Sequence, residues 1–492
     1  MMNSFSRRAA LRIGGACLGA TLAPAGGFGR RSSGDPLQRR IEQNAIPVPT
    51  SDDQQWTARE VDQLTAAIGN ARVVMLGEPS HGAGAAFAAK ARLIKVLHER
   101  CGFDAVVWES GFIDLERTEA AFRDGVDPVE GAQRGIFKIW SASEECRPLF
   151  VYAQASHKTK RPLIMAGFDM QLTAPGTLDY FAGELNTFVG TLDGKAQPRV
   201  QELAGKVLRH AGRLWQYSDA LARKNDELGR SGVTDAARGA AMQVWEQTAG
   251  EALRPLAEDR DQLDEAAGEL ADLLSQAATR GTGSGARRRE FMIRAVMGLA
   301  GFGSNLVEEQ GRPYADQEAR YALSRENRRD RINADNLKWL IDTAYVGRKI
   351  IVWAHNVHVM DAWYGKDFDS ISLKPLAEGM KTTGVWLADW YGPGVYRIGF
   401  TAWQGSDGLV GAPPTPVPTA PPDSVEERLH RFGAGEVLLP LHCKRSSGST
   451  LPGPVSMRIP KWKVETLENA AQPFDALYFI DTMRPATLIR SA

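Results

Sequence analysis

Residues 71–82 read ARVVMLGEPSHG, in which an apolar run ends on Glu78. Three later apolar runs end in the same way: AVVW on Glu109, LIMAGF on Asp169 and IIVWA on His355. Short apolar runs between turn residues are typical of buried strands. Because the carboxyl ends of parallel strands share one edge of a sheet, where ligands bind, the four runs predict that these side chains meet in one cleft.

Each of these residues also has a simpler interpretation, because an acidic residue after a strand often only caps the next helix. The repetition argues against that interpretation for the set. Two of the four are also followed closely by a histidine: His81 after Glu78, and His358 after His355. The pattern as a whole favours a functional cleft.

Strand and helix patterns alternate between about Trp56 and Met170 and return after about residue 306. This alternation predicts an α/β fold with a mostly parallel sheet covered on both faces by helices. The predicted strands are Ala71–Gly77, Asp104–Glu109, Pro162–Phe168, Lys349–Ala354, Tyr396–Thr401 and Ala476–Ile480. The predicted helices are Ala85–Arg100, Leu115–Arg123, Glu144–Lys160 and Arg320–Thr343.

The predicted organisation has four parts, of which the first, residues 1–25, is a signal peptide. Residues 26–55, rich in Gly, Ser, Pro and Arg, form a linker, so structure should begin near Trp56. Residues 177–305 lose the strand pattern and carry apolar residues at three- and four-residue spacing, which predicts a helical insertion. Residues 56–176 and 306–492 form the α/β catalytic core. The Pro-rich stretch 411–424 predicts an extended surface loop.

The first 25 residues are typical of a twin-arginine signal peptide. Arg7-Arg8 precedes a short, weakly apolar stretch, and Ala23-Pro24-Ala25 offers a cleavage site. The sequence therefore predicts a periplasmic or secreted protein with no stable membrane association after cleavage. Lys plus Arg and Asp plus Glu are both 59, so there is no basic surface excess and we expect no nucleic-acid partner.

The clustered residues allow two kinds of chemistry. Histidine and carboxylate side chains in one cleft can activate water by general acid/base catalysis, and the same side chains can bind a metal ion. The HExxH metal motif, the GxSxG nucleophile elbow and the phosphate-binding glycine loops are all absent from the sequence. The cysteines left after cleavage, Cys101, Cys146 and Cys443, show no CxxC spacing and are predicted to be buried thiols.

Five motifs, in this order, resemble the erythromycin esterase family: LGEPSHGAG, AVVWESG, MAGFDMQ, RDRINADNLKWLID and VWAHNVHV. The resemblance spans about Trp56 to Ile480. It implies a three-layer α/β/α protein with a helical insertion. It also implies hydrolysis of a carboxylic ester or macrolide lactone, as in antibiotic resistance, by histidine-activated water and without a cofactor or an obligatory metal.

Carried onto this chain, the resemblance makes His81 the catalytic base, Glu78 its orienting partner and Glu109 a second carboxylate. His355 and His358 would bind substrate or stabilise the tetrahedral oxyanion. The predicted substrate-binding residues are Lys90, Arg92 and Asp169, whereas Arg331 and Asn336 are expected to pack.

Two alternatives remain open. One is a metal-dependent hydrolase with Glu78, His81, His355 and His358 as ligands, and the other is a non-catalytic binding protein for an apolar ligand. Small residues from Ala83 to Ala86 depart from the family pattern, so the natural substrate, a small-molecule ester or a macrolide, is not specified by the sequence.

Overall fold

A computed structural model describes most of the chain after residue 34. The described residues are 35–192, 194–230, 235–248, 257–277, 284–309, 319–361, 367–368, 371–372, 379–441, 451, 453–459, 461–469 and 473–490. The predicted signal peptide and residues 26–34 lie outside this range, so export stays a prediction. Within it, no helix is long and apolar enough to cross a membrane.

A central sheet of nine strands forms the middle layer, in the order β1-β10-β13-β8-β2-β5-β3-β4, with β9 paired to β8. The six strands from β13 to β4 are parallel to one another, whereas β10, β1 and β9 pair antiparallel. The strands are β1 (Ile46–Pro47), β2 (Val73–Leu76), β3 (Phe103–Gly111), β4 (Ile164–Asp169), β5 (Lys349–Trp353), β8 (Val395–Asp407), β9 (Thr415–Val417), β10 (Glu436–Pro440) and β13 (Ala476–Met483). The predicted mostly parallel sheet is therefore confirmed.

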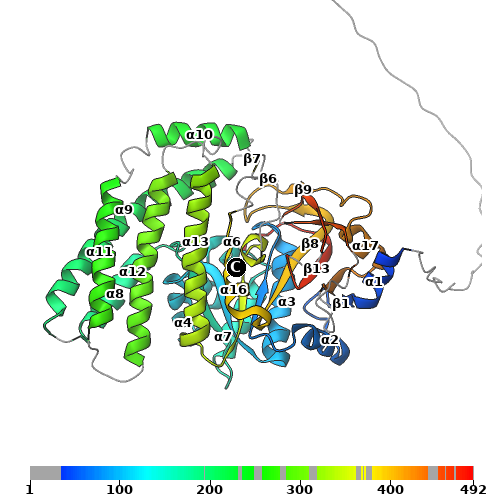
Figure 1. The fold of residues 1–492 in the computed structure, drawn as a ribbon, viewed down its shortest axis with the longest axis horizontal. Coiled ribbons are helices and arrows are strands. Elements are labelled where there is room, and N and C mark those ends of the chain that lie inside the picture. Colours follow the sequence, from blue (N-terminus) through cyan, green and yellow to red (C-terminus); the bar gives the residue numbers. More distant parts are fainter. Residues whose placement is uncertain are drawn as a thin grey trace, which may run out of the picture.

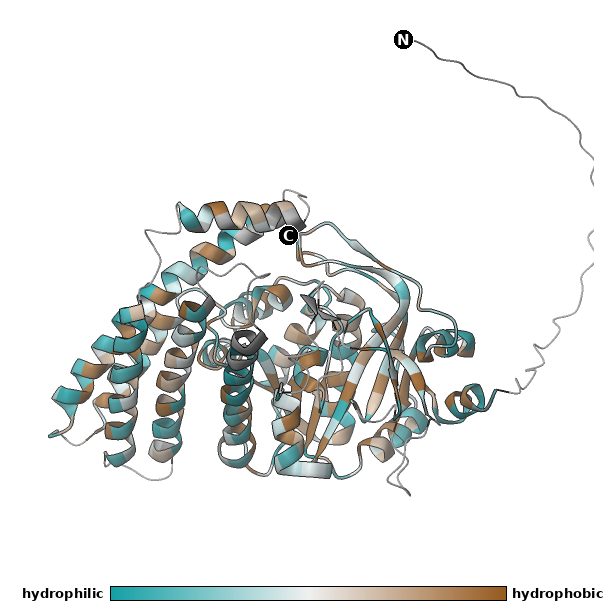
Figure 2. Cartoon of the chain, turned by 45° about the horizontal axis from the view of Figure 1, so that its top comes forward, coloured by the Kyte–Doolittle hydropathy of each residue, from teal (hydrophilic) through white to brown (hydrophobic). Residues whose placement is uncertain are grey.

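Both faces of the sheet are buried, as the alternation of side chains along β2 shows. Val73 and Met75 belong to one hydrophobic cluster, whereas Val74 and Leu76 belong to a second cluster on the opposite face. Neighbouring side chains of a strand point to opposite faces, so two separate cores require helices on both sides. In Figure 2 the strands of the central sheet are largely brown, as expected for a sheet buried on both faces.

The helices divide between these two clusters and complete a three-layer α/β/α fold, as predicted. The face with Val74 is covered by α2 (Ala58–Ile68), α3 (Gly84–Cys101), α4 (Asp114–Arg123), α5 (Pro128–Gln133), α6 (Lys138–Ser141) and α7 (Arg147–Ser156). The other face is covered by α1 (Pro36–Asn44), α8 (Thr177–Val189), α12 (Ser284–Glu309), α13 (Ala319–Trp339), α16 (Thr383–Tyr391) and α17 (Val425–Phe432). Shorter pieces are α14 (Asn356–Val359), the π turn Leu340–Ala344, the 3₁₀ turn Gly392–Gly394 and the hairpins β6–β7 (Asp367–Phe368, Ile371–Ser372) and β11–β12 (Val455–Arg458, Val464–Leu467).

Helices account for the described secondary structure between β4 and α13. Besides α8 and α12 these are α9 (Gln197–Arg230), α10 (Asp235–Gln247) and α11 (Ala257–Gln276). Figure 1 shows α9, α11, α12 and α13 side by side next to the sheet, with α10 across their top. The domain boundaries predicted around this helical region stay predictions.

The predicted linker is wrong for residues 36–47, and structure begins well before Trp56. Asp35 caps α1 by accepting hydrogen bonds from the backbone N–H groups of Leu37 and Gln38. Strand β1 then pairs with β10 at the edge of the sheet. The predicted surface loop 411–424 also contains the short edge strand β9. Strands β1 and β9 are too short to show a hydrophobic pattern of their own in the sequence. Each is stabilised by pairing with another strand.

The two reduced cysteines differ from each other. Cys146 is buried, as expected, whereas Cys101 is only partly buried, which corrects the prediction for that residue. Cys443 lies outside the described residues.

At the carboxyl-end edge of the sheet, the chain leaves the neighbouring strands β2 and β5 in opposite directions along the sheet. From β2 the chain passes to β3, and from β5 it crosses back past β2 to β8. Such a switch point opens a crevice at the carboxyl ends of the strands. Asn356 holds this edge together, because its side chain exchanges hydrogen bonds of 2.8 and 3.0 Å with the backbone of Phe400, and its N–H donates to the carbonyl of Glu78.

Gly77→Ala is expected to destabilise the protein by about 1–3 kcal/mol through overpacking. The added Cβ would lie only 2.0 Å from Oδ1 of Asn356. Gly298→Ala in α12 is the matched control, since its Cβ would lie 3.9 Å from Met170, an ordinary contact. This control should stabilise the protein by about 0.5–1 kcal/mol, because alanine favours a helix. Urea denaturation measures both, and a Gly77→Ala protein as stable as wild type would contradict the expectation.

Candidate active site

The residues predicted to carry chemistry lie in one connected cluster beyond β2, β3 and β5. Nδ1 of His81 lies 2.8 Å from Oε1 of Glu78, and the rings of His81 and His355 have centroids 5.1 Å apart. The N–H of His355 donates to Glu109 at 2.8 Å, and Nε2 of His358 lies 3.2 Å from the same carboxylate. The expected convergence is therefore present, whereas the roles of these residues stay predictions.

Glu78 is completely buried and forms a hydrogen bond with His81. Its Oε1 accepts hydrogen bonds from His81 and, at 3.1 Å, from the indole N–H of Trp140. Its Oε2 accepts a bond of 2.7 Å from Nζ of Lys90, which is itself buried under the ring of Trp353. Because the carboxylate accepts, Nδ1 of His81 carries a proton, and Nε2 is the nitrogen left to act as a base.

His81 is the most accessible member of this group. Its side chain is 36% exposed, whereas that of Glu78 is 0% exposed. The edge of Trp140 packs against its ring at 5.6 Å. Gly408, after β8, donates to the carbonyl of Gly82, and a Cβ on Gly82 would overlap Gly408. The backbone beside His81 is therefore fixed by close packing rather than left as a free turn.

His355 is held as a neutral hydrogen-bond donor. Its Nδ1 accepts a bond of 3.1 Å from the N–H of Val357 as the N-cap of α14, so the ring proton lies on Nε2. Burial, and next the neighbouring His81, lower the pKa of His355 well below its usual value. A buried neutral imidazole N–H beside the proposed base is suited to stabilising a negative oxygen.

His358, three positions further on, is in the opposite state. Its Nδ1 lies 2.9 Å from Asp330 and its Nε2 3.2 Å from Glu109. Burial opposes ionisation, but the two carboxylates raise the pKa of His358 well above its usual value. His358 is therefore a buried cation with both nitrogens donating, so it holds the cluster together and does not take up a proton.

Arg329 joins Glu109 to Asp169. Its Nη2 donates to Glu109 at 3.0 Å and to Asp169 at 2.5 Å, and its Nε lies 3.3 Å from Asp169. Burial would raise the pKa of Glu109, but His358 and Arg329 hold it well below the usual value. The buried Glu109 therefore stays ionised.

Trp140, Arg329 and Asp330 were missed from the sequence. The quoted motif RDRINADNLKWLID starts at Arg329-Asp330, so a signal for two of them was present. Of the residues singled out there instead, Arg331 is exposed and pairs with Asp335, and Asn336 packs at the sheet edge by donating to the carbonyl of Phe168. Trp140 follows no predicted strand, so the strand-end pattern could not indicate it, and it lies in the hydrophobic core.

The three predicted substrate-binding residues lie in different surroundings. Asp169 borders the cluster through Arg329. Lys90 is 0% exposed and pairs with Glu78, so its position favours a role in orienting that carboxylate. Arg92 points away from the cluster and donates 2.7 Å bonds to both oxygens of Glu436, which also accepts from Tyr478. Nothing in this geometry favours Arg92 as a substrate ligand, and its predicted role is untested.

The alternative of a metal site concerns the same cluster. Among the described residues, no three or more His, Cys, Asp or Glu side chains form a group able to hold a metal ion. A metal bound by the four proposed ligands would have to displace the bonds from Lys90 and Trp140 to Glu78 and from Val357 to His355. The arrangement fits a hydrogen-bonded base better than a ligand set.

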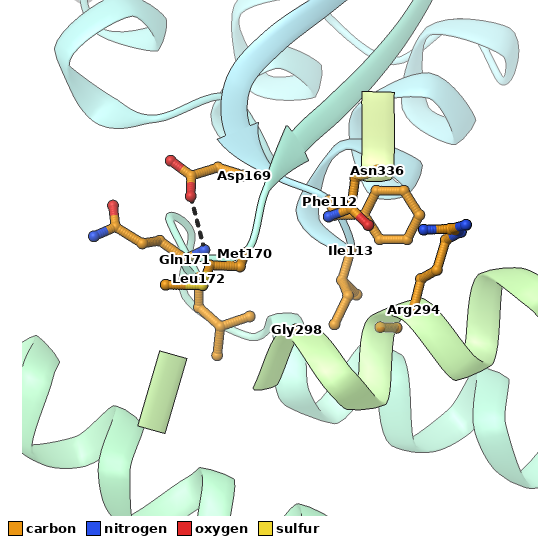
Figure 3. A pocket seen from close by; sticks show the side chains of 10 residues that line it. Phe112, Ile113, Asp169, Met170, Gln171, Leu172, Arg294, Gly298 and Asn336 are labelled. Atoms are coloured by element: carbon orange, nitrogen blue, oxygen red, sulfur yellow. Dashed lines mark hydrogen bonds between the residues drawn. The ribbon is translucent and has the colours of Figure 1, made fainter. Parts of the chain in front are cut away.

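A small, partly open pocket adjoins the cluster between the end of β4 and α12. Figure 3 shows Asp169, Met170 and Leu172 on one side and Phe112, Asn336 and Arg294 on the other. The Asp169 carboxylate accepts from the N–H of Gln171 at 3.1 Å, so the same residue borders the pocket and the Arg329 pair. The remaining lining residues are Ile113, Gln171, Ala295 and Gly298.

Comparison with known proteins gives consistent results. The family model for erythromycin esterase matches residues 98–483. YbfO of Bacillus subtilis (strain 168), named as a hydrolase, is 24% identical over 459 residues, which cover 92% of each chain.

Three solved structures are similar over most of the chain, and at this level of identity they show the fold alone. A succinoglycan biosynthesis protein has a TM-score of 0.62 at 16% identity and covers 92% of this chain and 97% of its own. A Bacillus cereus protein has a TM-score of 0.60 at 17% identity, covering 92% and 98%. An erythromycin esterase mutant, EreC, in its open conformation has a TM-score of 0.57 at 17% identity, covering 89% and 98%.

The raised pKa of His358 makes its contribution to stability depend on pH. A histidine with a raised folded-state pKa stabilises fully below its unfolded value of about 6.5, and the stabilisation is lost as pH rises through the folded-state pKa. We therefore expect His358→Gln to lower the free energy of unfolding by about 3–5 kcal/mol at pH 6, as for a broken buried ion pair, and by less at high pH.

His355→Gln is the control with the opposite sign. The pKa of His355 is lowered, so wild type should lose stability relative to this variant as pH falls below about 6.5. Denaturant unfolding at a series of pH values measures both. A His358→Gln deficit that stays constant or grows toward high pH would contradict the assignment of His358 as a buried cation.

Proposed function

Because the chain belongs to the erythromycin esterase family, a membership that supports a hydrolase, we propose that it cleaves a carboxylic ester or macrolide lactone with water activated by His81. One observation carries this proposal. It is the 2.8 Å hydrogen bond from the accessible His81 to the fully buried Glu78, which fixes the tautomer of a base open to solvent.

The proposed reaction needs only the chain and water. Nε2 of His81 takes a proton from water as the oxygen adds to the ester carbonyl carbon, giving a tetrahedral intermediate. The protonated His81 is stabilised by Glu78 through Nδ1. When the intermediate collapses, the C–O bond to the alcohol breaks and the leaving oxygen takes the proton from Nε2. The products are the acid and the alcohol, and His81 returns to its starting state.

The neutral His355 is suited to the developing negative charge. Its Nε2–H lies on a ring whose centroid is 5.1 Å from that of His81. Since a donor that is already oriented and buried needs no reorganisation during the reaction, this N–H would stabilise the oxyanion of the intermediate.

A macrolide lactone is the more specific substrate in this proposal, and one observation supports it. The matching family model is named for an erythromycin esterase. A simple ester requires the same carbonyl chemistry, so the two substrates are separated by experiment.

His81→Ala is expected to lower turnover by about 10²–10⁴-fold, the usual loss of a positioned base. Purified protein is incubated with 14-membered macrolides and with simple aryl esters, and products are followed by mass spectrometry for the addition of one water. His430→Ala is the matched control, since His430, on α17, is 39% exposed and also pairs with a carboxylate, that of Asp481 on β13. It should leave the rate unchanged.

Other outcomes separate the alternatives. Turnover that persists in His81→Ala contradicts the proposed base. Activity lost to a chelator and restored by zinc supports the metal-dependent hydrolase instead. Ligand-induced thermal stabilisation without any product supports a binding protein.

Trp140→Phe is expected to lower kcat by about tenfold, because hydrogen bonds to charged groups contribute about 1.5–3 kcal/mol. The indole N–H donates to the same Glu78 oxygen that orients His81. Trp353→Phe is the matched control, since Trp353 is equally buried but its indole nitrogen makes no hydrogen bond to the described residues. Equal losses in the two variants would show that packing alone, and not the bond to Glu78, is responsible.

A further inference from the structure

We propose that Arg329 contacts the substrate through Nη1, and that the acceptor it binds is an uncharged oxygen close to the scissile ester. This inference rests on the proposed function and adds a substrate-binding residue and a substrate class. The observation behind it is that Arg329, which pairs with carboxylates through only one side of its guanidinium, lies beside the buried residues next to His81.

Only one side of the Arg329 guanidinium forms hydrogen bonds with the protein. Nε and Nη2 face the carboxylates of Asp169 and Glu109. Nη1 makes no hydrogen bond to any of the described residues, and it is not sealed from solvent. Two N–H groups of Nη1 therefore remain for a ligand, in an orientation that is fixed by the two carboxylates.

The exposure of the three side chains places Arg329 at the surface of this cluster. Its side chain is 17% exposed, whereas those of Glu109 and Asp169 are 3% and 1% exposed. The carboxylates are thus covered, and the guanidinium is the group that they present outward. An arginine held in this way loses little side-chain entropy on binding, which favours a ligand contact.

Glu109 connects this guanidinium to the proposed chemistry. One Glu109 oxygen accepts from Arg329 and the other from the N–H of His355. His355 in turn packs its ring against His81. A substrate whose carbonyl lies over His81 and His355 therefore extends toward Arg329 on the side of β3 and β4.

Charge decides which acceptor fits. In the buried network Arg329 and His358 face the three carboxylates of Glu109, Asp169 and Asp330. A further ion pair, Glu78 with Lys90, is balanced.

The five side chains of this network therefore carry one net negative charge. An anionic substrate group would thus find no net attraction to offset its loss of hydration, whereas a carbonyl, hydroxyl or ether oxygen needs only the N–H donor.

The first test uses wild-type protein with two probes of similar size, 4-nitrophenyl butyrate and the anionic 4-nitrophenyl hemisuccinate. Wild type should prefer the neutral ester by at least about tenfold in kcat/KM, the usual effect of leaving one charge without a partner. An equal or greater kcat/KM for the anionic ester would overturn the substrate class. This test uses wild-type protein alone, so its result does not depend on whether a variant folds.

The second test is Arg329→Lys, which keeps the charge beside Glu109 and Asp169 but removes Nη1. For 4-nitrophenyl butyrate we expect KM to rise about 10- to 100-fold, the effect of a charge-assisted hydrogen bond, with kcat within about twofold. Arg331→Lys is the matched control two positions along α13, where the side chain is 47% exposed and pairs with Asp335. It should behave as wild type.

The outcomes separate this inference from the proposed function. If wild type hydrolyses the ester and His81→Ala does not, but KM is unchanged in folded Arg329→Lys, only the contact through Nη1 is wrong. If wild type hydrolyses neither probe nor any macrolide, the proposed function and this inference both fail.

Discussion

The ionised carboxylate of Glu109, buried at the end of a central strand, is the constraint on which the rest of the site depends. An ionised carboxylate taken out of water costs several kcal/mol unless it is paired and hydrogen-bonded. Here Arg329, His358 and the N–H of His355 supply that pairing. These partners come from α13 and from the turn after β5, so the sheet edge and the helical layer must be assembled together.

Glu78 meets the same constraint in a different way. Lys90 and Trp140 satisfy it from inside the core, and His81 satisfies it from the open side. The result is a difference in exposure within the cluster. Glu78 and Lys90 are paired and fully buried, whereas the imidazole of His81 is accessible. Such an arrangement lets one group exchange protons with water while its supports stay fixed, which is the preorganisation that general base catalysis needs.

Sequence patterns predict those parts of the site that depend on residues close together in the sequence. Apolar runs located β2 and β4 to within two residues, and parallel strands bring their ends together, so the convergence of Glu78 and Glu109 followed. The short strand β1 has no pattern of its own, because pairing with β10 stabilises it. The sequence also did not show that Arg329, and not Arg331, contacts the sheet edge. Helix α13 carries arginines on several sides, and only its docking decides which of them meets the sheet.

The two histidines of the motif HNVH show how much of the chemistry lies in the surroundings. His355 caps α14 and accepts from a backbone N–H, so it stays neutral and keeps one proton to donate. His358, one turn later, lies between Asp330 and Glu109 and stays charged. Histidine is also the commonest metal ligand, yet here one side chain packs against His81 and the other pairs with the buried carboxylates. The helical turn separates them, and the carboxylates on either side of His358 decide the outcome.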